Sequence, residues 1–133
     1  MQKFSSATIY VVDDDDAVRD SMRALLESHG LTVRDYSSAL HFLGEEERLY
    51  ATEGFYGCLL LDLHMPGMDG AELLERLSER GSPLPVIVLT GRADATLRER
   101  VIRAGARALL EKPVTEDELK YEIGRALLDR PAD

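Results

Sequence analysis

The stretch Ile9-Tyr10-Val11-Val12-Asp13-Asp14 decides the fold, because a short apolar run ends there directly in two acids. A second run, Cys58-Leu59-Leu60-Leu61, ends in Asp62, 48 residues after Asp14. Short runs rich in Val, Ile and Leu predict strands that are buried on both faces of a sheet. In open α/β sheets, ligands bind beyond the carboxyl ends of such strands. We therefore expect the acids to meet at one edge of a parallel sheet.

Carboxylates gathered in this way repel one another, so the site needs a cation or bound protons. Hard oxygen ligands favour Mg²⁺. The pattern therefore predicts a magnesium site that is built from Asp13, Asp14 and Asp62.

Apolar runs alternate with segments of helical periodicity along the whole chain. We expect strands near residues 8–12, 32–36, 58–62, 85–90 and 107–111. We expect helices near residues 16–29, 38–47, 69–80, 95–104 and 116–128. Such alternation predicts a parallel sheet with right-handed crossovers and helices on both faces.

Local signals set several boundaries of these elements. Gly30 and Gly105 are placed to end the first and fourth helices. Thr115-Glu116-Asp117-Glu118 is a capping-box pattern that opens the fifth helix. The acidic segment 44–48 is expected to end the second helix, and residues 49–57 to form a loop.

Composition limits the class of protein. The chain has 133 residues, which predicts one domain over 1–133 with a core at about 8–128. A net charge of −9 argues against binding nucleic acid or anionic membranes through this chain. No apolar stretch reaches membrane-spanning length and residues 1–6 do not resemble a signal peptide, so we expect a cytoplasmic protein. The one cysteine, Cys58, is expected to be a buried apolar residue.

The last two strands also end in polar residues. The run Val86-Ile87-Val88-Leu89 precedes Thr90, and Ala108-Leu109-Leu110-Glu111 precedes Lys112. Acids with a metal, a hydroxyl donor and an ammonium group at one edge suit phosphoryl transfer to a carboxylate.

At this point the chain resembles the receiver domain of bacterial two-component response regulators, and within it the nitrogen-fixation regulator subgroup. The resemblance covers residues 8 to 128 and implies a doubly wound, flavodoxin-like sheet of strand order 2-1-3-4-5. Receivers of that subgroup usually precede a helix-turn-helix output domain, and we expect none in this chain. The segments that carry the resemblance are Val11-Val12-Asp13-Asp14-Asp15, Leu61-Asp62-Leu63-His64-Met65-Pro66-Gly67-Met68-Asp69-Gly70, Leu89-Thr90-Gly91 and Glu111-Lys112-Pro113.

The resemblance implies a role for each acid. Asp62 would accept the phosphoryl group. Asp14 and Asp62 would bind Mg²⁺ directly, and Asp13 would act through metal-bound water. The backbone carbonyl of His64 would be a further ligand, while its imidazole is not expected to bind the metal.

The resemblance also assigns the other strand ends and the partners. Thr90 would hydrogen-bond a phosphoryl oxygen, and Lys112 would pair with Asp62 before phosphorylation and with the phosphoryl group after it. The Lys112-Pro113 bond would be cis. The phosphodonor would be a histidine kinase and the output an unidentified protein partner. The chain would be no enzyme beyond its own phosphorylation and dephosphorylation.

One position departs from the family pattern, because Leu109 replaces an aromatic residue whose rotation accompanies activation. We still expect the responsive face to span about residues 95–128. At least half of Leu97, Val101, Leu119 and Ile123 are expected to be ordinary core residues. A weak homodimer that phosphorylation enhances is expected through whichever of them are exposed. His64 and Arg92 occupy positions that tune the access of water to the phosphoryl group in this family.

Two other classes do not fit. Haloacid-dehalogenase-type phosphatases need a second acid two residues after the nucleophile, where this chain has His64. A flavodoxin-like cofactor binder needs a phosphate loop after the first strand, where residues 13–16 are all Asp and would repel phosphate. For the output, a free-standing receiver and a fragment of a longer DNA-binding transcription regulator both remain open.

Overall fold

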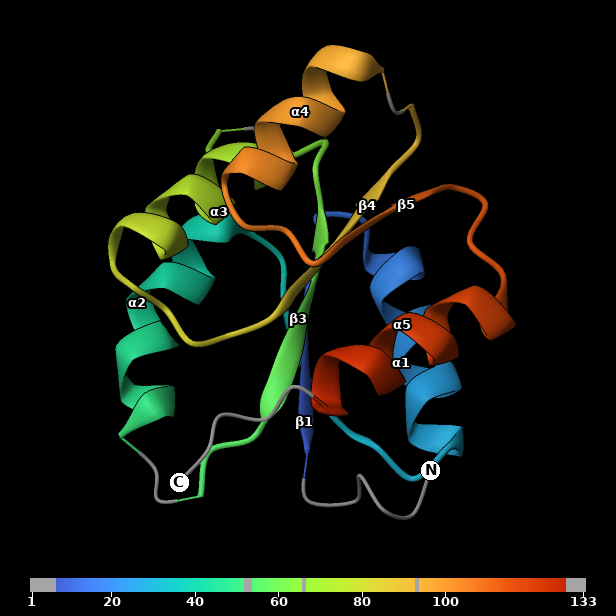
Figure 1. Cartoon of the computed structure of the whole chain (residues 1–133). Coiled ribbons are helices and arrows are strands. Elements are labelled where there is room, and N and C mark those ends of the chain that lie inside the picture. Colours follow the sequence, from blue (N-terminus) through green and yellow to red (C-terminus); the bar gives the residue numbers. More distant parts are fainter. Residues whose placement is uncertain (1–6, 52–53, 66, 93, 129–133) are drawn as a thin grey trace.

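The computed structural model describes residues 7–51, 54–65, 67–92 and 94–128. Its strands form one parallel sheet of order β2-β1-β3-β4-β5 (Figure 1). The predicted fold class is therefore confirmed. The terminal segment 1–6, which was not expected to be a signal peptide, lies outside the described residues. The strands are β1 (Thr8–Val12), β2 (Thr32–Tyr36), β3 (Gly57–Asp62), β4 (Val86–Thr90) and β5 (Ala108–Glu111).

Helices cover both faces of the sheet, with α1 and α5 on one side and α2, α3 and α4 on the other (Figure 1). They are α1 (Asp16–Ser28), α2 (Ala39–Tyr50), α3 (Gly70–Glu79), α4 (Ala95–Arg103) and α5 (Glu116–Leu128).

The two layers give the protein two hydrophobic cores. Along β1, Ile9 and Val11 pack in the core under α1 and α5, whereas Tyr10 and Val12 pack in the core under α2, α3 and α4. Successive side chains of a strand point to opposite faces. Because both faces are covered, the central strands are apolar at nearly every position, which is the pattern that predicted them.

Local caps fix where the helices begin. The carboxylate of Asp15 accepts hydrogen bonds from the N–H groups of Ala17 and Val18, which caps α1 just after the paired acids. At α5, the N–H of Glu118 donates to the Thr115 hydroxyl at 3.0 Å, and the N–H of Thr115 donates back to the Glu118 carboxylate. The predicted capping box is confirmed.

The end of α2 differs from the prediction. The helix runs to Tyr50 instead of ending near residue 47. The acidic segment looked like a solvated helix end, but Glu46 is 1% exposed and its carboxylate pairs with Arg80 at 3.0 Å. Because Phe42, Glu46 and Leu49 share one buried face, the packing continues through the segment and the helix continues with it.

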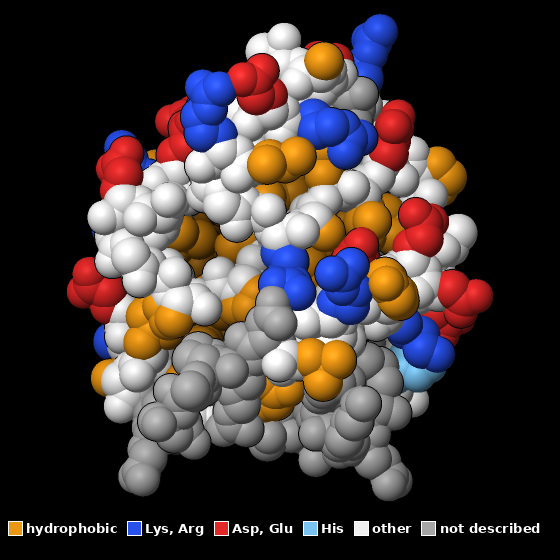
Figure 2. Space-filling model, viewed as in Figure 1, with side chains coloured by type: hydrophobic (Ala, Val, Ile, Leu, Met, Phe, Trp, Pro, Cys, Tyr) orange, Lys and Arg blue, Asp and Glu red, His pale blue; other side chains and the backbone are white. Residues whose placement is uncertain are grey.

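The contact residues named for a homodimer are mostly core residues. Val101, Leu119 and Ile123 are buried, and Leu97 is partly buried against the core. The expectation that at least half of these residues belong to the core is therefore confirmed, and none of the four is exposed for a contact between copies of the chain. Figure 2 shows the outer face over α4, β5 and α5, where charges of both signs lie between separate apolar side chains. The large apolar side chains exposed in this region are Ile102, Tyr121 and Leu128.

Two further predictions can be compared with the described residues. Cys58 is fully buried in β3, and burial raises the pKa of its thiol to about 12, so it behaves as an apolar core residue. Among the described helices, none has the length and apolar character that crossing a bilayer requires.

Candidate functional site

The acids that follow β1 and β3 meet at one edge of the sheet. Carboxylate oxygens of Asp13, Asp14 and Asp62 lie within 4.8 Å of one another. Asp13 is 3% exposed and Asp62 is 5% exposed, whereas Asp14 is exposed to solvent. The site is therefore a shallow acidic cluster with two buried members and one that faces water.

Backbone and side-chain hydrogen bonds hold the first acid in place. The N–H of Asp13 donates to the carbonyl of Tyr36 at 3.1 Å, and Arg19 donates to the Asp13 carbonyl at 2.7 Å. The N–H of Asp15 donates to the Asp13 carboxylate at 2.9 Å. The turn from β1 into α1 is therefore tied to the neighbouring strand.

Gly70 allows α3 to start against the backbone of Asp62. A Cβ added at Gly70 would lie 2.3 Å from the Asp62 carbonyl oxygen and 2.7 Å from the Leu63 Cα, and both atoms belong to the backbone. Such distances are far inside van der Waals contact. The Asp69-Gly70 sequence thus caps α3 through Asp69 and lets the helix approach the end of β3.

The electrostatics of the cluster oppose full ionisation. Burial raises the pKa of the Asp13 carboxyl above its ordinary value of 3.8, and the charges of Asp62 and Asp14 raise it further. The hydrogen bond from Asp15 and the charge of Lys112 act in the opposite direction. The protein alone therefore does not fully offset the free-energy cost of ionising Asp13 in the folded state.

This donor set fits a small divalent cation. The three carboxylates supply hard oxygen ligands within reach of one ion, and a cation there would favour the ionised form of Asp13, whose pKa burial raises. The chain therefore carries an Asp cluster that can hold a metal such as Mg²⁺.

Lys112 brings an ammonium group to the cluster from the end of β5. Its Nζ lies 3.3 Å from Asp62 Oδ1 and 3.9 Å from Asp13 Oδ2. The Lys112-Pro113 peptide bond is cis, as predicted. The structure thus brings Lys112 beside the carboxylate that was singled out as the phosphoryl acceptor.

Thr90 is fully buried at the end of β4, and its hydroxyl contacts a residue that the sequence did not connect to it. His64 Nε2 lies 2.8 Å from Thr90 Oγ1. The backbone N–H of His64 also donates to Asp62 Oδ1 at 3.3 Å. Sequence reasoning considered His64 as a metal ligand and as a residue that tunes the access of water, and it missed the ring contact with Thr90.

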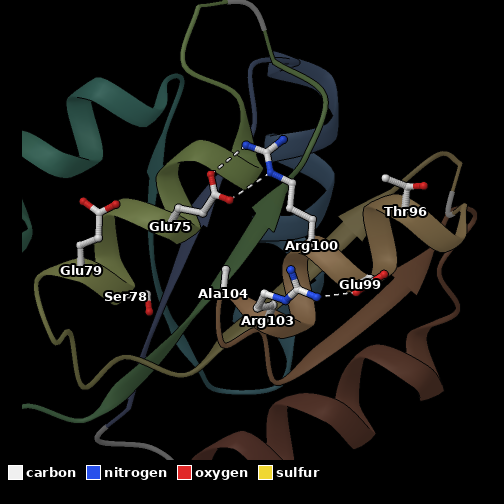
Figure 3. A pocket seen from close by; sticks show the side chains of 8 residues that line it. All are labelled: Glu75, Ser78, Glu79, Thr96, Glu99, Arg100, Arg103 and Ala104. Carbon is white, nitrogen blue, oxygen red and sulfur yellow. Dashed lines mark hydrogen bonds and ion pairs between the residues drawn. The ribbon is translucent and has the colours of Figure 1, made fainter.

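The described surface also has pockets outside the carboxylate cluster itself, and two of them flank elements of the site. One is an apolar groove of about 350 Å³ beside the acids, between α1 and the start of α5, whose lining includes Asp15, Met22 and Val114. The other is an open pocket of about 550 Å³ between α3 and α4 (Figure 3). Arg100 from α4 reaches across it and donates two hydrogen bonds to the carboxylate of Glu75.

Comparison with known proteins assigns the chain to a family. A family model, the response regulator receiver domain, matches residues 9–124. The chain belongs to this family. The acidic cluster and the strand ends beside it all lie inside the matched residues, so the site described above is part of a receiver domain.

This receiver is similar to curated transcriptional regulators. It is 41% identical over 128 residues to the transcriptional regulatory protein FixJ of Azorhizobium caulinodans, covering 96% of this chain and 58% of that protein. It is 38% identical over 121 residues to the response regulator protein TmoT of Ectopseudomonas mendocina, covering 91% of this chain and 53% of that protein. The receiver thus spans little more than half of these relatives.

Solved structures agree with this assignment. The crystal structure of FixJ-N superposes on the receiver with a TM-score of 0.83 and 33% identity, covering 96% of this chain and 98% of that one. A CheY-like receiver protein from Methanospirillum hungatei JF-1 gives a TM-score of 0.81 at 32% identity, covering 92% of this chain and 94% of that one. The predicted resemblance to the nitrogen-fixation subgroup is confirmed.

Proposed function

We propose that the chain is a phosphorylation-activated receiver of a two-component system, which accepts a phosphoryl group from a histidine kinase on Asp62. The observation that carries this proposal is the placement of Asp62, which is buried at the end of β3 between Lys112 and the carboxylates of Asp13 and Asp14. A buried carboxylate with an ammonium partner and further acids nearby has few structural reasons to exist.

The transfer step follows from these groups. A carboxylate oxygen of Asp62 attacks the phosphorus of a phosphohistidine, the P–N bond breaks, and its electron pair returns to the imidazole nitrogen of the donor. The product is an acyl phosphate on Asp62. Lys112 stabilises negative charge on the phosphoryl oxygens, and Thr90 donates a hydrogen bond to one of them.

The proposed roles of the metal-binding residues are those that the family resemblance implies. Asp14 and Asp62 would bind Mg²⁺ directly, with the His64 carbonyl as a further ligand, and Asp13 would act through bound water. The ion, when bound, neutralises the carboxylates and the phosphoryl oxygens during transfer. Asp13 and Asp14 therefore serve to keep a cation beside Asp62.

The signal would be a population shift that the phosphoryl group drives. Phosphate favours the arrangement in which both Thr90 and Lys112 reach it. The segment 95–128 is the proposed responsive face, because α4 follows Thr90 closely and Val101 is the one buried residue of that helix. This face would contact a protein partner, or a second copy of the chain in a weak homodimer.

A second candidate for the output rests on the relatives. They are named transcriptional regulators and are nearly twice as long as the matched region. The receiver would then control a DNA-binding part of a longer protein. The reading frame of the gene beyond Asp133 distinguishes the two outputs, since a helix-turn-helix pattern there favours the longer regulator.

The proposal is tested with a low-molecular-weight phosphodonor and Mg²⁺. We expect wild-type protein to gain one acid-stable, hydroxylamine-labile phosphate, and the Asp62→Asn variant to gain none, because an amide is no nucleophile for this transfer. Intact-mass and peptide mass spectrometry measure both. Asp20→Asn, which changes an exposed acid of α1, is the matched control and should react normally. An Asp62→Asn protein that is phosphorylated at the wild-type rate would overturn the assignment and move it to Asp13 or Asp14.

A further inference from the structure

His64 joins the ends of two neighbouring strands at the site. Its backbone N–H donates to Asp62 Oδ1 at 3.3 Å, and its Nε2 lies 2.8 Å from Thr90 Oγ1. The residue itself is exposed, whereas Asp62 and Thr90 are buried. An exposed ring therefore forms a hydrogen bond with a fully buried hydroxyl, directly beside the proposed phosphoryl acceptor.

The hydroxyl of Thr90 has no spare proton in this arrangement. Its oxygen lies 3.1 Å from the Arg92 carbonyl and accepts from the Arg92 N–H at 3.2 Å. A hydroxyl has one proton and two acceptor sites. Whichever tautomer the ring of His64 adopts, the proton of Thr90 goes either to the Arg92 carbonyl or to His64 Nε2. A phosphoryl oxygen can receive it only after Thr90 leaves one of these partners.

We infer that the imidazole of His64 is a positioning residue that holds Thr90 in the resting arrangement and competes with the phosphoryl group for it. This inference rests on the proposed function of Asp62 and adds a determinant of its switching. The phosphoryl group shifts the population toward the active arrangement only as far as its interaction free energy there exceeds the free energy of the contacts that the resting arrangement loses. Removal of the His64–Thr90 hydrogen bond therefore lowers the threshold for activation.

The position of His64 suits such a release. The ring sits on an exposed residue in the loop after β3, so it can leave Thr90 for water without opening a cavity in either core. The Thr90 hydroxyl, by contrast, is buried. A phosphoryl group bound at the site is the partner that can replace His64 or the Arg92 carbonyl. The contact between His64 and Thr90 is therefore the part of this network that can exchange most readily.

The first test measures the affinity for beryllofluoride, a phosphoryl mimic, in the presence of Mg²⁺. We expect His64→Ala to bind it about 2- to 10-fold more tightly than wild type, which is the ratio that one net hydrogen bond gives. His64→Gln places an amide nitrogen near the position of Nε2 and should return the affinity toward the wild-type value. His41→Ala, which removes an exposed imidazole near the start of α2, outside the segment 95–128, is the matched control and should have no effect.

The second test observes Thr90 itself, without beryllofluoride or metal. In His64→Ala the Thr90 methyl resonance should move toward its position in the beryllofluoride-bound wild type, whereas in His64→Gln it should not. A structural role of His64 unconnected to Thr90 would not produce this pattern. In a Thr90→Val background, His64→Ala should no longer change the affinity, because the competing hydroxyl is gone.

The outcomes separate this inference from the proposed function. If His64→Ala binds beryllofluoride no more tightly and the Thr90 methyl does not move, the inference is wrong, while phosphorylation of Asp62 still supports the proposed function. A wild-type protein that neither binds beryllofluoride nor gains phosphate on Asp62 overturns both.

Discussion

At the scale of single residues, the folded protein without metal disfavours the ionised form of Asp13. Burial, together with the charges of Asp62 and Asp14, raises the pKa of its carboxyl. A carboxyl whose pKa is higher in the folded than in the unfolded state favours folding at low pH, and this contribution is lost as the pH rises through the two pKa values. At neutral pH the ionised Asp13 therefore lowers the free energy of unfolding.

We expect Asp13→Asn to raise the free energy of unfolding by about 1 kcal/mol at pH 7 in EDTA, because the amide fills the same space without the charge. The gain should vanish below the ordinary pKa of an aspartate, where both proteins are neutral at this position. Urea denaturation at pH 7 and at pH 3 measures the difference. Asp20→Asn, at an exposed position, should change stability by less than about 0.5 kcal/mol. A loss of stability in Asp13→Asn at pH 7 would contradict the electrostatic argument.

The sequence could predict which residues gather at the site but not all of their contacts. Asp13, Asp62, Thr90 and Lys112 follow strands of one parallel sheet, and the ends of such strands necessarily share an edge. The ring contact of His64 depends on a side-chain rotamer and on the path of the loop after β3. Neither leaves a periodic signal in the sequence, so this contact is visible only in the folded structure.

At the scale of elements, α4 is a helix that is mostly exposed. Val101 is its one buried residue, and a two-pronged ion pair from Arg100 to Glu75 ties it to α3 (Figure 3). The hydrogen bonds from Arg100 lower the pKa of the Glu75 carboxyl. A depressed carboxyl pKa contributes stability above the unfolded-state value, and this contribution is lost as the pH falls through the folded-state value.

We expect Glu75→Gln to lower the free energy of unfolding by about 0.2–1 kcal/mol at pH 7, the range of exposed ion pairs. The effect should shrink in high salt, and it should also shrink as the pH falls toward the lowered pKa of Glu75. Urea denaturation at two salt concentrations and at pH 7 and pH 3 tests this. Glu79→Gln, an exposed acid of the same helix, serves as the control. An effect of Glu75→Gln that is equally large in acid would mean that packing, not the ion pair, is responsible.

The boundaries of the elements were predictable to within one residue, except for the end of α2, which runs three residues further than expected. The error came from treating the acidic segment 44–48 as solvated. Glu46 is buried because Arg80, from the end of α3, reaches its carboxylate. Burial of a charge by a residue 34 positions away is a tertiary effect, and local pattern cannot anticipate it.

At the scale of the whole molecule, the sheet order and the two cores follow from the alternation of strands and helices with both faces covered. The same topology places β1 and β3 side by side at the centre of the sheet, and thereby forces their terminal acids together. The fold therefore brings mutually repelling carboxylates together at one edge of the sheet. This repulsion should lower the free energy of unfolding of the whole domain.

A divalent cation should therefore stabilise the protein globally. At a Mg²⁺ concentration 100 times Kd, binding to the folded state alone adds about 2.7 kcal/mol to the free energy of unfolding. Thermal midpoints measured with Mg²⁺ and with EDTA should differ accordingly. In Asp14→Ala the difference should be lost, because the exposed ligand of the cluster is gone, while Asp20→Ala should retain it. Equal midpoints for the wild type at saturating Mg²⁺ and in EDTA would mean that the acids are compensated without metal, by Lys112 or by bound protons, and would remove the cation from the proposed site.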